Sequence, residues 1–118
     1  MAGNPEYPLE LLSREPKIRA RAVFPKTFVG FDGHFLGAPL LPGFMHVQTA
    51  LDVLRKAGEP HLLKEVTVGK FTRPILPEAP VIVTLSRGEH ANSYEVTVIS
   101  SDEICSTFTI IVEAASHV

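Results

Sequence analysis

The N-terminal part of the chain contains one short segment in which apolar and polar residues alternate. Between Lys17 and Phe24, one side carries the apolar residues Ile18, Ala20, Ala22 and Phe24. This period of two predicts a strand with one buried face, and Pro25 ends it. Residues 1–16 carry three prolines. We expect them to form an irregular lead-in, with at most a short helical turn at Leu9–Ser13.

The period changes to that of a helix after Gly43. Apolar residues follow helical spacing at Phe44, Met45, Val47, Ala50, Leu51 and Leu54. Arg55 and Lys56 suit the C-terminal end of a helix, and Gly58 with Pro60 predicts its stop. Because the apolar arc is wide, we expect this helix to be largely buried.

Four more segments are predicted to be strands: Leu63–Phe71, Val81–Gly88, Ser93–Ser100 and Ile104–Val112. Residues 88–92 and 101–103 have the composition of turns between them. A strand, a long loop, one helix and a run of antiparallel strands predict an α+β fold with the helix against a sheet. We expect residues 1–118 to form a single domain.

The loop of residues 26–43 separates the first predicted strand from the helix. It holds four glycines and two prolines, a density that excludes regular structure. Loops of this length in compact domains are uncommon and often functional. His34 lies in this loop, ahead of a helix start, and is a candidate acid–base residue. For a histidine taken alone, hydrogen bonding to backbone carbonyls is the alternative.

Composition adds limits on function. The chain has 118 residues, a net charge of −2 and 20% charged residues, so its overall charge gives no case for nucleic-acid or membrane binding. Cys105 is the single cysteine, which excludes an intrachain disulfide and a thiolate metal cluster. We expect no metal and no cofactor. The first residues lack the pattern of a signal peptide, so we expect a cytoplasmic protein.

Two blocks of sequence resemble a known enzyme family. Residues 31–45 read F-D-G-H-F-L-G-A-P-L-L-P-G-F-M, and residues 68–77 read V-G-K-F-T-R-P-I-L-P. Both are similar to the FabA/FabZ-type 3-hydroxyacyl-[acyl-carrier-protein] dehydratases, and the resemblance covers about residues 17–113. It implies the hotdog fold, in which a curved antiparallel sheet wraps one long central helix. It also implies a homodimer, with higher assembly an option.

The resemblance assigns roles to individual residues. His34 corresponds to the general base that takes the α-proton of a 3-hydroxyacyl thioester. Backbone N–H groups at Gly43 and Phe44 would hold the thioester carbonyl. The substrate, an acyl-carrier-protein or CoA thioester, would be contacted by Phe35, Gly37, Pro42, Phe71 and Arg73.

The chain departs from the family pattern at one important position. The family has a catalytic Glu or Asp where this chain has Gln48, and an amide cannot act as an acid or a carboxylate base. Gln48 is expected to hold a water or the substrate hydroxyl, or alternatively to pair within a dimer interface. Asp52 lies one helical turn further on, on the same face, and is expected to be solvated or salt-bridged. The alternative is that Asp52 supplies the missing carboxylate. His46 is expected to be a packed or interface residue.

These assignments lead to one principal function and two alternatives. The principal function is dehydration of a 3-hydroxyacyl thioester to the trans-2-enoyl thioester in fatty-acid or polyketide-like biosynthesis. Because of Gln48, a hotdog protein that binds acyl thioesters or their carrier protein without turnover is the first alternative. A thioesterase is the second alternative.

Overall fold

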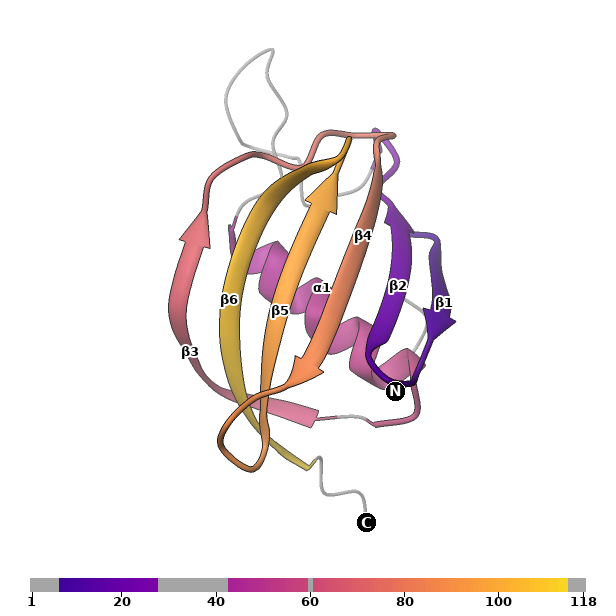
Figure 1. Cartoon of the computed structure of the whole chain (residues 1–118). Helices are drawn as coiled ribbons and strands as arrows, with labels where there is room; N and C mark the ends of the chain where they lie inside the picture. Colours follow the sequence, from indigo (N-terminus) through magenta and orange to yellow (C-terminus); the bar gives the residue numbers. More distant parts are fainter. Residues whose placement is uncertain (1–6, 28–42, 60, 115–118) are drawn as a thin grey trace.

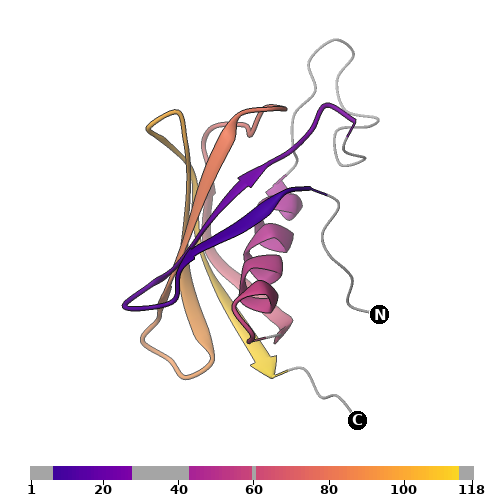
Figure 2. The same cartoon turned by 90° about the vertical axis from the view of Figure 1, so that its right-hand side faces the viewer.

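The computed structural model describes residues 7–27, 43–59 and 61–114. It contains one helix and six strands, in the order β1 (Leu9–Ser13), β2 (Ile18–Val23), α1 (Gly43–Lys56), β3 (His61–Phe71), β4 (Pro80–Arg87), β5 (Ser93–Ser100) and β6 (Glu103–Ala114). A curved sheet covers one side of α1, as the two views in Figures 1 and 2 show. This is the hotdog architecture that the resemblance implied.

The six strands form one antiparallel sheet in the order β1-β2-β4-β5-β6-β3. The bounds of β2 to β6 agree with the predicted strands to within two residues. The tight turn between β5 and β6 is made by Ser101 and Asp102, both with positive φ (54° and 62°). Two such residues in succession match the right-handed twist of paired strands. In the described sheet, β1 and β3 are the two edges.

The prediction for Leu9–Ser13 was wrong, because this segment is a strand and not part of an irregular lead-in. It pairs with β2, with Leu9 opposite Ala22 and Leu11 opposite Ala20. Leu9 and Leu11 pack against the core. The segment is too short and too close to prolines to show a clear period of two, and its conformation is determined by pairing with β2.

The core lies between α1 and the concave face of the sheet. Alternate residues of the strands point into it, and the following have at most 2% of their surface exposed: Ala20, Ala22, Val81, Val83, Leu85, Val96, Val98, Phe108, Ile110 and Val112. From the helix, Ala50, Val53 and Leu54 are completely buried. This confirms the predicted buried face of the first strand and fixes which face of α1 meets the sheet.

The helix ends as predicted but is less buried than expected. The N–H of Gly58 donates to Arg55 O (3.0 Å) and that of Glu59 to Leu54 O (2.8 Å), with Gly58 at φ +88°. This pair of bonds is a Schellman cap. Only seven of the fourteen helical residues are buried, and Phe44 is 67% exposed. Among the described residues, the first half of α1 borders a groove beside the edge strand β3.

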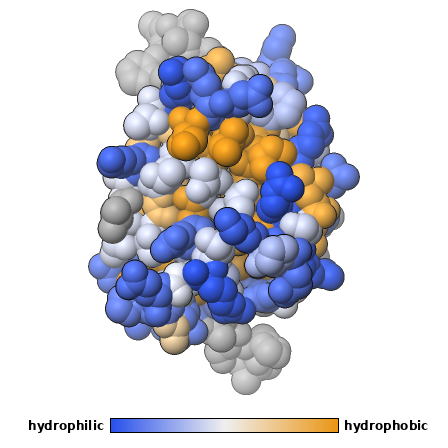
Figure 3. Space-filling model, viewed as in Figure 1, coloured by the Kyte–Doolittle hydropathy of each residue, from blue (hydrophilic) through white to orange (hydrophobic). Residues whose placement is uncertain are grey.

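The convex face of the sheet carries a separate apolar patch. Ile82, Ile99 and Ile104 are successive cross-strand neighbours on β4, β5 and β6. Figure 3 shows apolar side chains gathered at this end of the sheet among mainly polar ones. Because this face is opposite α1, the patch is not part of the groove described below.

Candidate active site

An apolar groove lies between the first half of α1 and strand β3. Its volume is about 480 Å³, and it is lined by Gly43, Phe44, Val47, Gln48, Leu51, Leu63, Val66 and Phe71. Gln48 is the one polar side chain among these lining residues. A largely apolar groove with one polar contact suits a ligand with an apolar chain and a single polar group near it.

The groove brings together four residues that the sequence singled out. Gly43, Phe44 and Gln48 come from α1, and Phe71 comes from the end of β3. Their roles in chemistry stay predictions. Four other candidates, which are His34, Phe35, Gly37 and Pro42, lie outside the described residues.

The ring of Phe71 is placed by its neighbours at one end of the groove. It stacks on Phe108 with centroids 5.6 Å apart and meets the ring of His46 edge-on at 5.5 Å. A Cβ added to Gly69 would lie 3.0 Å from this ring, and one added to Gly43 would lie 3.5 Å from it. The two glycines therefore let the ring pass between β3 and the start of α1.

The start of α1 offers backbone donors to the groove. The N–H groups of the first turn have no acceptor within the helix, and they lie at the positive end of its dipole. Gly43 and Phe44 are in this turn and line the groove, and the turn has no acidic residue. A carbonyl oxygen that gains negative charge would be stabilised here.

The side chain of Gln48 is held by a hydrogen bond to Asp52, one turn later on α1. Its Nε2 donates to Asp52 Oδ1 at 3.0 Å. Asp52 is 8% exposed, accepts a hydrogen bond from the Tyr7 hydroxyl on Oδ2 (2.5 Å) and pairs with Arg55 at 3.5 Å. Of the two alternatives expected for Asp52, the salt bridge is observed, whereas the side chain is not solvated. Asp52 is not among the residues that line the groove, and whether it replaces the family carboxylate stays open.

His46 is packed in the core, as expected. It is 2% exposed, and its Nδ1 lies 2.7 Å from Ser106 Oγ on β6. The contact joins α1 to the sheet.

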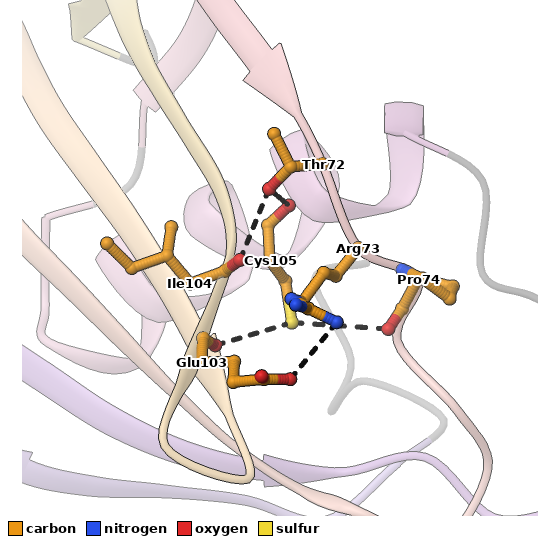
Figure 4. A network of polar contacts seen from close by, with 6 residues as sticks. All are labelled: Thr72, Arg73, Pro74, Glu103, Ile104 and Cys105. Atoms are coloured by element: carbon orange, nitrogen blue, oxygen red, sulfur yellow. Dashed lines mark hydrogen bonds and ion pairs between the residues drawn. The ribbon is translucent and has the colours of Figure 1, made fainter.

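Arg73 lies outside the groove, although it is only two residues from Phe71. Its guanidinium pairs with Glu103 at 3.1 Å (Figure 4). It also lines a separate pocket of about 180 Å³. The backbone N–H groups of Thr72 and Arg73 both donate to Cys105 O, at 2.9 and 3.1 Å. These bonds hold the segment that follows β3 against β6. Arg73 is therefore not among the residues that line the groove, and its role in substrate binding stays a prediction.

Cys105 lines the same separate pocket and is a structural residue. It is 2% exposed, and burial raises the pKa of its thiol, which keeps it protonated and a poor nucleophile. Within residues 7–27, 43–59 and 61–114, no three His, Cys, Asp or Glu side chains are grouped so that they could hold a metal ion.

No helix in the described part of the chain is long and apolar enough to cross a membrane.

Sequence reasoning missed contributors to this region from two segments, β3 and the lead-in before β1. Leu63 and Val66 line the groove from β3, and their place on the concave face depends on strand register, which a single sequence fixes poorly. Tyr7 lies in the proline-rich lead-in, where no local pattern indicates that its hydroxyl reaches Asp52.

The buried phenol of Tyr7 predicts a specific pH dependence of stability. Burial and the neighbouring Asp52 carboxylate raise the pKa of Tyr7 far above its ordinary value. Above pH ~10 the unfolded chain releases this proton and the folded chain retains it, so the stabilisation present at lower pH is lost as pH rises. We expect wild type to lose up to about 1.4 kcal/mol per pH unit more than Tyr7→Phe in this range.

Urea unfolding at several pH values between about 9 and 11 measures this difference. Burial also raises the pKa of Tyr94, but that residue is present in both proteins, so its contribution cancels. If the free energy of unfolding changes with pH equally in wild type and Tyr7→Phe, the raised pKa of Tyr7 is contradicted.

Comparisons with solved structures show the same fold. The ApeI:P dehydratase heterocomplex from Xenorhabdus doucetiae matches with a TM-score of 0.74 and 18% identity, over 90% of this chain and 94% of that one. The PaaI protein of the E. coli phenylacetic acid degradation operon matches with a TM-score of 0.67 and 13% identity, over 89% and 82%. A hypothetical thioesterase with coenzyme A from Streptococcus pneumoniae TIGR4 matches with a TM-score of 0.66 and 7% identity, over 93% and 88%.

At these identities, the structural matches establish the hotdog fold alone. A search of curated proteins finds no significant match. The family model described as ApeI dehydratase matches residues 11–109, which is most of the chain and includes α1 and the groove-lining part of β3. The chain therefore belongs to the ApeI-like dehydratase family of hotdog proteins.

Proposed function

We propose that this protein dehydrates a 3-hydroxyacyl thioester to the trans-2-enoyl thioester, in fatty-acid or polyketide-like biosynthesis. The observation that carries the proposal is the apolar groove that starts at the N-terminus of α1 and carries Gln48. Membership of the ApeI-like dehydratase family supports the reaction class. The more specific assignment to the FabA/FabZ type rests on the sequence motifs.

In the proposed reaction, the acyl chain occupies the groove along Val47, Leu51 and Leu63. The thioester carbonyl accepts hydrogen bonds from N–H groups at Gly43 and Phe44, where enolate charge would be stabilised. His34, which precedes α1 in the sequence, removes the α-proton as general base.

Elimination then breaks the bond between Cβ and the hydroxyl oxygen. The electron pair of the enolate forms the Cα–Cβ double bond, and the leaving hydroxide takes the proton from His34 to become water. An amide at position 48 supplies no proton. Gln48 instead holds the hydroxyl by hydrogen bonding, so one histidine serves as both base and acid.

The reaction is tested by incubating the purified protein with 3-hydroxyacyl thioesters of CoA and of acyl carrier protein. Formation of the conjugated enoyl thioester, followed by ultraviolet absorbance and mass spectrometry, is the expected result. The corresponding acyl thioester without the hydroxyl is the control and should give no signal.

Two other outcomes would favour the alternatives. Tight binding of acyl thioesters without dehydration would indicate a binding protein, which the missing carboxylate at Gln48 favours. Release of free CoA thiol would indicate a thioesterase, a class to which a hypothetical protein of the same fold is assigned.

We also propose that the chain forms a homodimer through β3. This edge strand exposes Leu62, Leu63, Val66 and Phe71 by 38–53%, and an open edge with apolar side chains is a surface that proteins usually cover. A second copy paired along β3 would continue the sheet and close the groove. The related ApeI is described as a heterocomplex, so a different hotdog subunit at this edge is the other outcome of the test.

A charge on β3 should separate the subunits. Leu63→Asp places a carboxylate among apolar side chains at this edge, and burying an unpaired charge is strongly unfavourable. Leu12→Asp is the matched control, because Leu12 on the other edge strand is almost equally exposed (42% against 40%). Analytical ultracentrifugation should show a dimer for wild type and Leu12→Asp and a monomer for Leu63→Asp. A monomeric wild type would contradict a homodimer.

A further inference from the structure

The orientation of the Gln48 amide is determined by its neighbour. Asp52 follows one turn later on α1, and its Oδ1 accepts the hydrogen bond from Gln48 Nε2 at 3.0 Å. An ionised carboxylate only accepts hydrogen bonds, so the amide must turn its nitrogen toward Asp52. The carbonyl oxygen of Gln48 is then the end left for the groove, which Gln48 lines.

Asp52 is itself held in place on its other side. The buried Tyr7 hydroxyl donates to Oδ2 at 2.5 Å, and the Arg55 guanidinium lies 3.5 Å from Oδ1. Tyr7 is 5% exposed and packs on Phe24 with ring centroids 4.4 Å apart. Donors to both carboxylate oxygens of Asp52 therefore hold its observed rotamer.

We propose that Asp52 is a positioning residue that makes position 48 a hydrogen-bond acceptor, so the groove selects ligands with a hydroxyl beside the thioester. This inference rests on the proposed function of the groove. The oxygen of Gln48 accepts a hydrogen bond from the β-hydroxyl of a 3-hydroxyacyl chain. A saturated acyl chain of the same length has no donor to offer and leaves this oxygen without a ligand partner.

The test compares 3-hydroxyoctanoyl-CoA with octanoyl-CoA as probes. Tyr7→Phe/Asp52→Leu replaces both buried partners with apolar groups of similar shape, which limits the loss of stability. The preference for the hydroxylated probe should fall about three- to tenfold, the value of one hydrogen bond, while affinity for octanoyl-CoA is unchanged. Gln48→Met, which removes the acceptor itself, should reduce the preference equally.

The chain offers a matched control for this variant. Tyr94 donates to Glu59 Oε1 at 2.9 Å, which is a similar tyrosine–carboxylate contact just beyond the C-terminal end of α1. Tyr94→Phe/Glu59→Leu should keep the full preference. An unchanged preference in Tyr7→Phe/Asp52→Leu, or an equal loss in this control, would overturn the inference.

The readout separates this inference from the proposed function. If the wild type dehydrates the hydroxylated probe, the preference is calculated from kcat/KM for that probe and Kd for octanoyl-CoA. If the wild type does not dehydrate it, the preference is the ratio of the two Kd values. A wild type that dehydrates while Tyr7→Phe/Asp52→Leu keeps its preference leaves the function standing and refutes the role of Asp52. A wild type with neither dehydration nor preference refutes both.

Discussion

His34→Ala is expected to reduce kcat for dehydration of a 3-hydroxyacyl thioester by about 10²–10⁴-fold. In the proposed reaction this histidine both removes the α-proton and returns a proton to the leaving hydroxide, and loss of a general acid–base group has this magnitude. Because Gln48 cannot take over either step, we expect the upper part of the range. KM should change little, since the groove and the helix start are untouched.

The control is a second histidine-to-alanine change far from the groove. His90 is exposed in the turn between β4 and β5 and has no role in the proposed reaction. His90→Ala should keep wild-type kcat and KM. If His34→Ala retains full activity, another residue is the base and the motif has been assigned incorrectly.

Restoring a carboxylate at position 48 is expected to raise the rate strongly only when Asp52 is neutralised as well. Gln48→Glu alone puts a second carboxylate at hydrogen-bond distance from Asp52, because the present contact is 3.0 Å. Two carboxylates so close share one proton, which is then not available to the leaving hydroxide. With Asp52→Asn, the new amide can donate to the introduced carboxylate and leave its other oxygen facing the groove.

We therefore expect Gln48→Glu/Asp52→Asn to raise kcat by about 10²-fold or more, within the range of general acid catalysis. Each single variant should gain far less, so the two changes are not additive. Steady-state rates for the four proteins across pH measure this coupling. Equal rates for Gln48→Glu and the double variant would show that Asp52 does not restrain position 48.

The sequence predicted the parts of the fold that have a clear local signal. The alternation from Ile18 to Phe24 and the glycine after α1 both correspond to observed features, because burial of one strand face and a positive φ restrict residue choice locally. The strand at Leu9–Ser13 was missed because its conformation depends on pairing with β2. The exposure of Phe44 was missed because periodicity shows which residues share a face and not what covers that face.

In the candidate site, the motifs likewise indicated some residues, whereas other contacts depend on the tertiary fold. Motif position alone placed Gln48 and Phe71 at one groove, although they come from different elements. The same motif suggested Arg73, which is not among the groove-lining residues and pairs with Glu103, so its role stays a prediction. The contact between Tyr7 and Asp52 joins residues 45 positions apart in the sequence, so no spacing rule could indicate it.

The position of Tyr7 has a practical consequence for comparing and shortening such chains. The family match begins at residue 11, yet the tyrosine that anchors Asp52 precedes it. A chain trimmed to the matched region would keep every groove-lining residue. It would still lose the hydrogen bond from Tyr7 that holds Asp52, the partner of Gln48. Trimming would also remove Leu9 and shorten β1, which pairs with β2. Relatives that lack an aromatic residue here are expected to hold position 48 by another contact, and with it to choose their ligands differently.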